Sequence, residues 1–115
     1  NIIGLNRTGE DTLTHGYRSI KILSGSRGNT IGPGNVISGN KQNGIYINGT
    51  GTDSTTIIGN YIGTDASGTK RIGFQSIGIY ITMKSRDNVI GGSTAEERNV
   101  TWKWQRYLGV GRSTA

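Results

Sequence analysis

The feature that most constrains this chain is an internal repeat with a period of 59 residues. Residues 1–32 align with residues 60–91 without a gap, and eleven of the aligned positions are identical. Repeats of this length indicate stacked supersecondary units, each of which buries its apolar face against its neighbours. The repeat therefore predicts a solenoid.

A shorter pattern divides the long repeat into three columns of short segments. An Ile-x-Ile alternation, as in Ile20 to Ile22, puts both isoleucines on one face of a strand. The interval from Ile22 to Ile47 is 25 residues and the interval from Ile47 to Ile81 is 34, which together make 59. The long repeat is thus one short coil followed by one long coil. The segments are 19–22, 44–47 and 78–81 in column one, 29–32, 56–59 and 88–91 in column two, and 1–4, 35–38, 60–63 and 99–101 in column three.

Three short strands per coil predict an all-β parallel β-helix of about three coils with a triangular cross-section. Each strand is expected to pair in parallel with its counterpart one coil away, at a spacing of about 4.8 Å. The 20 glycines fit tight corners, because glycine accepts positive φ. The inward residues expected to stack are Ile22, Ile47 and Ile81 in column one, Ile31, Ile58 and Ile90 in column two, and Ile3, Ile37, Ile62 and Thr101 in column three.

Asparagine recurs just before the inward isoleucine of columns two and three. A stacked asparagine amide can bond the equivalent group one coil away and can satisfy backbone groups at a corner. We therefore expect these asparagines to hold the fold together rather than to bind a ligand. They are Asn29 and Asn88 in column two, and Asn1, Asn35, Asn60 and Asn99 in column three.

Three runs carry a resemblance to a known family: GPGNVISGNKQNGIYINGTG at 32–51, IIGNYIGTDASGT at 57–69 and NVIGGSTAEERNV at 88–100. They resemble the right-handed parallel β-helix repeats of large bacterial surface and secreted proteins, in the pectate-lyase-like superfamily. The resemblance covers about residues 1–100 and implies a right-handed coil and, for the parent family, an extracellular or cell-surface location. Because the chain begins inside a repeat, we expect it to be a fragment of a larger protein.

Residues 1–101 are interpreted as the repeat region, and residues 102–115 as a tail without the repeat. Trp102, Trp104 and Tyr107 make the tail the most aromatic part of the chain. Three interpretations of the tail stay open: a cap formed by a strand or short helix, a contact with another subunit, or a truncated or frame-shifted end. Because solenoid ends need covering, we expect a homo-oligomer joined through the coil ends or the tail.

Charge and composition bear on the partners and cofactors. The net charge is +6, but acidic and basic residues are interleaved over the first 100 residues. This pattern favours a solvated surface over a nucleic-acid groove. No apolar run approaches the roughly 18 residues of a membrane span. The chain has no cysteine, so it offers no thiolate metal ligand, and no metal or cofactor is predicted.

The first candidate ligand-binding surface is the outward face of column one. Lys21, Tyr46 and Tyr80 occupy the middle position of its three segments. We expect the two tyrosine rings to form a flat aromatic platform beside the lysine, of the kind that stacks on sugar rings. The alternative is that the tyrosines only stabilise the sheet as neighbours on adjacent strands.

The second candidate region is the pair of long connections from column three to column one, residues 5–18 and 64–77. They are expected to leave the same edge of the solenoid, with their roots about 10 Å apart. Long loops on a rigid scaffold usually carry function. Asp11, His15 and Asp65 lie in these connections and are the remaining candidate ligand-binding residues.

No catalytic residue is assigned, because the outward positions of column one include no carboxylate. An enzyme of the pectate-lyase-like kind would be expected to hold Ca²⁺ there with clustered acids. We interpret the chain as a non-catalytic β-helix scaffold or a weak carbohydrate-binding module, with polysaccharide as a partner. Two alternatives stay open: a remnant of a polysaccharide lyase or hydrolase, and an orphan open reading frame product without a selected activity.

Overall fold

A computed structural model describes residues 1–3, 5, 7–9, 18–39, 42–72, 77–82, 84–101 and 104–107. This part of the chain contains strands and no helix. The strands are short because a tight corner follows each of them. They are β1 (Ile2–Ile3), β2 (Arg18–Ile22), β3 (Thr30–Ile31), β4 (Val36–Ile37), β5 (Asn43–Asn48), β6 (Thr56–Ile57), β7 (Tyr61–Ile62), β8 (Ile77–Thr82), β9 (Val89–Ile90), β10 (Val100–Thr101) and β11 (Trp104–Tyr107).

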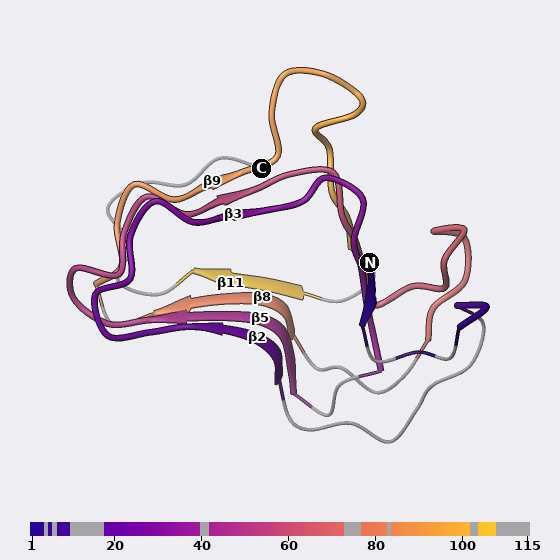
Figure 1. The fold of residues 1–115 in the computed structure, drawn as a ribbon, viewed down its shortest axis with the longest axis horizontal. Helices are drawn as coiled ribbons and strands as arrows, with labels where there is room; N and C mark the ends of the chain where they lie inside the picture. Colours follow the sequence, from indigo (N-terminus) through magenta and orange to yellow (C-terminus); the bar gives the residue numbers. More distant parts are fainter. Residues whose placement is uncertain are drawn as a thin grey trace.

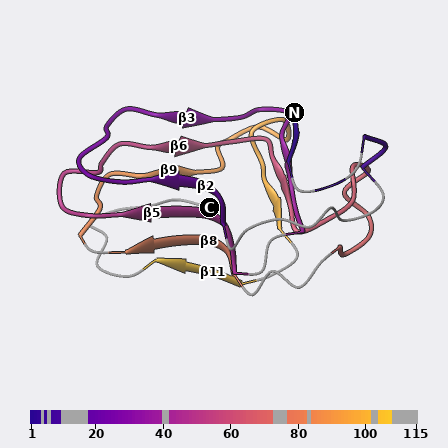
Figure 2. The same cartoon turned by 60° about the horizontal axis from the view of Figure 1, so that its bottom comes forward.

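The strands form three sheets in which all neighbours are parallel. The orders are β2-β5-β8-β11 for column one, β3-β6-β9 for column two and β1-β4-β7-β10 for column three. Consecutive strands of the chain therefore lie in different sheets, and each strand pairs with the one that is three places away in the sequence. Figures 1 and 2 show the column one and column two strands as two facing stacks. The chain is a parallel β-helix of about three coils, as the repeat predicts.

The strand register confirms the predicted coil lengths. Ile22 pairs with Ile47, and Ile47 pairs with Ile81, so the coils are 25 and 34 residues long. In column three, the predicted stack also holds: Ile37 pairs with Ile3 and Ile62, and Thr101 continues the stack above Ile62.

The predicted register of column two was wrong by one residue. Ile57, not Ile58, pairs with Ile31 in the coil below and with Ile90 in the coil above. Ile57 is fully buried, whereas Ile58 is partly exposed. In the other two coils, a glycine directly follows the inward isoleucine. In this coil Ile58 is an extra residue before that glycine.

The core is a single stack of isoleucines between the three sheets. Most of its members are completely buried, and those of the first coil are slightly exposed. Because successive coils place an isoleucine at the equivalent position, these side chains stack from coil to coil in continuous columns. The members are Ile22, Ile31, Ile37, Ile45, Ile47, Ile57, Ile62, Ile79, Ile81 and Ile90.

Two of the six predicted asparagines, Asn60 and Asn99, join the coils at the corners by donating from their side-chain amides, whereas the Asn35 side chain makes no such bond within the described residues. The Asn60 amide nitrogen donates to the Ile31 carbonyl at 3.0 Å and to Asn99 Oδ1 at 3.1 Å. The Asn99 amide nitrogen repeats the first bond one coil higher, donating to the Ile57 carbonyl at 2.8 Å. Both carbonyls also accept a backbone amide of the next coil, from Ile58 and Gly91, so each asparagine adds a second hydrogen bond where the corner begins.

Part of the predicted tail lies in the column one sheet. Strand β11 pairs in parallel with β8, and Tyr107 lies opposite Ile81. Trp102 lies outside the described residues, and the three interpretations of segment 102–115 stay predictions. Within the described ranges, no helix is long and apolar enough to cross a membrane.

Candidate functional site

The outward face of column one brings Lys21, Tyr46 and Tyr80 together. Parallel pairing places Tyr46 opposite Lys21 on one side and opposite Tyr80 on the other. The isoleucines that flank Tyr46 in the sequence, Ile45 and Ile47, are fully buried, so the alternation of the strand directs the tyrosine to the opposite face. We call these three outward residues the tyrosine–lysine strip.

The two tyrosine rings meet edge to face. Their centroids are 5.7 Å apart and their planes are inclined by 76°. The expectation of a flat platform is therefore wrong, because one ring turns its edge toward the other. Edge-to-face contact is a favourable arrangement of two rings, since the positive edge of one meets the negative face of the other. Tyr46 and Tyr80 are each half-buried, whereas Lys21 is exposed.

The two long connections touch, although their roots lie two coils apart. The Ala66 amide donates to the Gly9 carbonyl at 3.0 Å, and Figures 1 and 2 show these loops side by side. A Cβ atom at Gly9 would overlap the Cβ atom of Ala66, and Gly9 has a φ of +75°. Glycine is therefore required at this contact. Asp11 and His15, the candidate ligand-binding residues of the first connection, are outside the described residues.

Asp65 shapes its own loop. Its Oδ1 atom accepts hydrogen bonds from Ser67 Oγ at 2.7 Å, the Thr69 amide at 3.1 Å and the Lys70 amide at 3.3 Å. The hydrogen bond from Ser67 is the main cause that lowers the pKa of Asp65, with smaller help from the backbone amides and against the effect of burial. A carboxylate oxygen that already accepts these bonds acts first as the centre of the turn.

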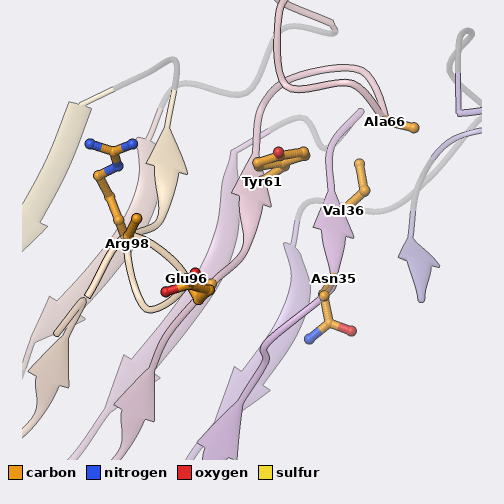
Figure 3. Close-up of a pocket in the computed structure, with 9 residues that line it drawn as sticks. Asn35, Val36, Tyr61, Ala66, Glu96 and Arg98 are labelled. Atoms are coloured by element: carbon orange, nitrogen blue, oxygen red, sulfur yellow. The ribbon is translucent and has the colours of Figure 1, made fainter. Parts of the chain in front are cut away.

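A hollow that the sequence reasoning missed lies over the outward face of column three (Figure 3). Its volume is about 330 Å³. Val36 of β4 and Tyr61 of β7 form its floor, and Tyr61 lies between Val36 on one side and Arg98 on the other. The full lining is Gly34, Asn35, Val36, Gly59, Tyr61, Ala66, Ala95, Glu96 and Arg98.

The corner that leads from column two to column three contains a signal for this hollow. Inward residues of the two columns are six apart from Ile31 to Ile37, but eleven apart from Ile90 to Thr101. The third corner must therefore project from the solenoid, and it carries Glu96 and Arg98 of the hollow.

Comparisons with known proteins assign the chain to no family, because no family model, no curated protein and no solved structure matches it. Functional inference therefore depends on the fold and on the side chains that the fold brings together.

Proposed function

We propose that this chain is a non-catalytic β-helix scaffold that binds carbohydrate weakly through the tyrosine–lysine strip. The observation that carries the proposal is the parallel register that aligns Lys21, Tyr46 and Tyr80 on one outward line. An aromatic ring offers its face to the C–H groups of a sugar ring, and a lysine ammonium donates hydrogen bonds to hydroxyl oxygens.

The edge-to-face geometry favours a weak and tolerant site. One tyrosine ring is turned by 76° from the other, so a sugar ring that stacks on one meets only the edge of the second. A stacking contact contributes about 1 kcal/mol, and an exposed hydrogen bond contributes a similar amount. A few such contacts correspond to a dissociation constant in the millimolar range, or about −4 kcal/mol.

We also propose a family for the chain. Its repeat motifs and its three parallel sheets support a place among the right-handed, pectate-lyase-like β-helix repeats of bacterial surface and secreted proteins. An extracellular or cell-surface location follows from that origin. A homo-oligomer joined through the coil ends fits the end strands β1, β2 and β3, each of which has one edge without a neighbouring strand among the described residues.

The proposal is tested by glycan-array binding, followed by titration of the bound glycan against ¹⁵N-labelled protein. We expect Tyr46→Ala and Tyr80→Ala to abolish retention, and Tyr80→Phe to preserve it because the ring face remains. Lys21→Ala should weaken binding, whereas the control Lys70→Ala, an exposed lysine in a different loop, should not. Far-UV circular dichroism verifies that each variant is folded. The absence of any retained glycan, or unchanged binding by both alanine variants, would reject the proposal.

A further inference from the structure

The hollow over column three is separate from the tyrosine–lysine strip, because the two lie on different sheets. Its central residue, Tyr61, is held firmly. Strand pairing places Tyr61 between Val36 below and Val100 above. Gly68 lies over the phenol end of the ring: a Cβ atom there would be 3.0 Å from Tyr61 Cζ and 3.1 to 3.2 Å from its two Cε atoms. The aromatic floor is therefore preorganised.

The wall on the Gly68 side is built by the turn around Asp65. That carboxylate accepts the hydroxyl of Ser67 and the amides of Thr69 and Lys70, which fixes the path of the chain on both sides of Gly68. Asp65 was a candidate ligand-binding residue, and its contacts make it a support for this wall.

The opposite wall is a turn closed by its own side chains. The Glu97 carboxylate accepts bonds from the Thr94 amide at 3.2 Å and from the Thr94 hydroxyl at 2.9 Å, and the Glu97 amide donates to the same hydroxyl at 3.3 Å. This reciprocal pattern is a capping box. The Glu97 carbonyl also accepts the Gly59 amide at 3.1 Å, which ties the wall to the corner of the coil below. The Glu97 Oε1 atom thus closes the turn, whereas the neighbouring Glu96 lines the hollow.

Glu96 and Arg98 are exposed at the hollow, and within the described ranges neither side chain has a hydrogen-bond or ion-pair partner. The side-chain amide of Asn35 also has no hydrogen-bond partner among the described residues. The hollow therefore offers one anionic acceptor, one cationic donor and one group that both donates and accepts. Ala66 and Ala95 add small apolar surfaces to the lining.

These groups select a neutral ligand rich in hydroxyls. An anionic ligand would be attracted by Arg98 and repelled by Glu96, and a cationic ligand would be attracted by Glu96 and repelled by Arg98. The two side chains together therefore add no affinity for a ligand with a net charge. The hydroxyl groups of a neutral ligand, by contrast, can donate to the carboxylate and accept from the guanidinium without a net charge that either group repels. The volume of about 330 Å³ is at the lower end of the range for small-molecule sites, about 300 to 1,000 Å³, and suits a single ring rather than a chain.

We propose that the hollow binds one neutral sugar unit. The C–H face of the sugar packs on Tyr61, one hydroxyl group donates to Glu96 and another accepts from Arg98. This site does not depend on the tyrosine–lysine strip, so each of the two proposals can fail alone.

The test is a titration of the ¹⁵N-labelled full chain with four neutral probes, the methyl glycosides of glucose, galactose, mannose and N-acetylglucosamine. Glucuronate serves as the anionic probe and free phenylalanine as the zwitterionic probe. We expect at least one neutral glycoside to shift the amide signals of residues 34–36, 59–61 and 95–98, in the wild type and equally in Tyr46→Ala. Arg98→Ala and Glu96→Gln should each weaken this binding about tenfold, since each removes a charge-assisted hydrogen bond.

Arg27→Ala is the matched control, because Arg27 is an exposed arginine in a corner away from the hollow, and it should leave the dissociation constant unchanged. Both Arg98 and Glu96 are exposed, so their replacement leaves the fold intact, and an unchanged amide spectrum elsewhere verifies this. The proposal is overturned if no neutral glycoside shifts these signals, if glucuronate or phenylalanine shifts them and the glycosides do not, or if Arg98→Ala binds as tightly as the wild type.

Discussion

Replacing Asn60 by aspartate tests the side-chain ladder that joins the coils. Asn60 is completely buried, and its amide nitrogen donates to two acceptors, the Ile31 carbonyl and Asn99 Oδ1. Asn60→Asp keeps the size and shape of the side chain but substitutes an oxygen for that nitrogen. The new oxygen then lies against the Ile31 carbonyl and Asn99 Oδ1 in a buried corner without a donor of its own, although these two acceptors keep the backbone amides of Ile58 and Asn60.

The magnitude follows from two lost hydrogen bonds and one buried charge. Each hydrogen bond that the Asn60 side chain donates contributes about 1 kcal/mol, and the new carboxylate carries a charge that burial disfavours. We expect the free energy of unfolding to fall by about 3 to 5 kcal/mol at neutral pH, a large part of the 5 to 15 kcal/mol typical of a domain. The loss should be smaller at pH 3, where the new carboxyl group is protonated and can donate one bond, because burial disfavours the charged form.

The assay is urea unfolding followed by circular dichroism, with Asn35→Asp as the matched control. Asn35 occupies the equivalent column three position one coil below, but it is partly exposed, and within the described residues its amide has no partner. The control should change stability by no more than about 0.5 kcal/mol. Equal losses for the two variants would show that the bonds of Asn60 contribute nothing and would refute the ladder as a stabilising device.

Three further predictions concern the core, the Asp65 turn and a tight corner. Ile57→Ala should lower the free energy of unfolding in urea by about 2 to 5 kcal/mol because this side chain is fully buried, whereas Ile58→Ala should lower it by less than half as much. A larger loss for Ile58→Ala would favour the register in which Ile58 faces inward. Folding lowers the pKa of Asp65. The ionised carboxylate therefore stabilises the fold fully at neutral pH, and this contribution is lost as the pH falls below about 4 and through the folded-state pKa. Asp65→Asn should therefore flatten the decline of unfolding free energy in acid, and an identical decline would contradict this role. Gly59→Ala should lower the melting temperature by several degrees in a thermal scan, because Gly59 has a φ of +64° and a Cβ atom there would lie 2.6 Å from the Pro33 side chain; an unchanged midpoint would count against the geometry of this corner.

Most of the fold can be predicted from the sequence because each coil repeats the same local pattern. Alternation fixes which residues face inward, and the interval between equivalent isoleucines fixes which strands pair. The pattern does not identify the inward residue where a corner changes length. Ile58 and the glycine after it look like the isoleucine–glycine pair of the other coils, and only pairing in three dimensions shows that Ile57 is the inward residue.

The two candidate sites also differ in how far the sequence predicts them. The tyrosine–lysine strip could be predicted because its members have equivalent positions in successive strands, although the inclination of the rings could not. Its ring geometry depends on side-chain torsions that the strand register leaves free. For the hollow, the residue spacing indicates only that the corner after Ile90 projects. It does not indicate the hollow itself, since Glu96 and Arg98 reach it through the capping box of Glu97 and the contact of that turn with Gly59.

The hollow thus exists because coils of unequal length are stacked. The strands of column three keep one register through all coils, and Val36 and Tyr61 would form a plain surface if every corner were as short as the one after Ile31. The longer corners at 64–72 and 91–99 rise on either side of that surface, and each is closed by a local carboxylate turn rather than by the core. Insertions at solenoid corners leave the ladder of backbone hydrogen bonds intact. Such a fold can therefore acquire a binding site at little cost in stability, with the recognition groups in the corners and the rigid floor in the strands.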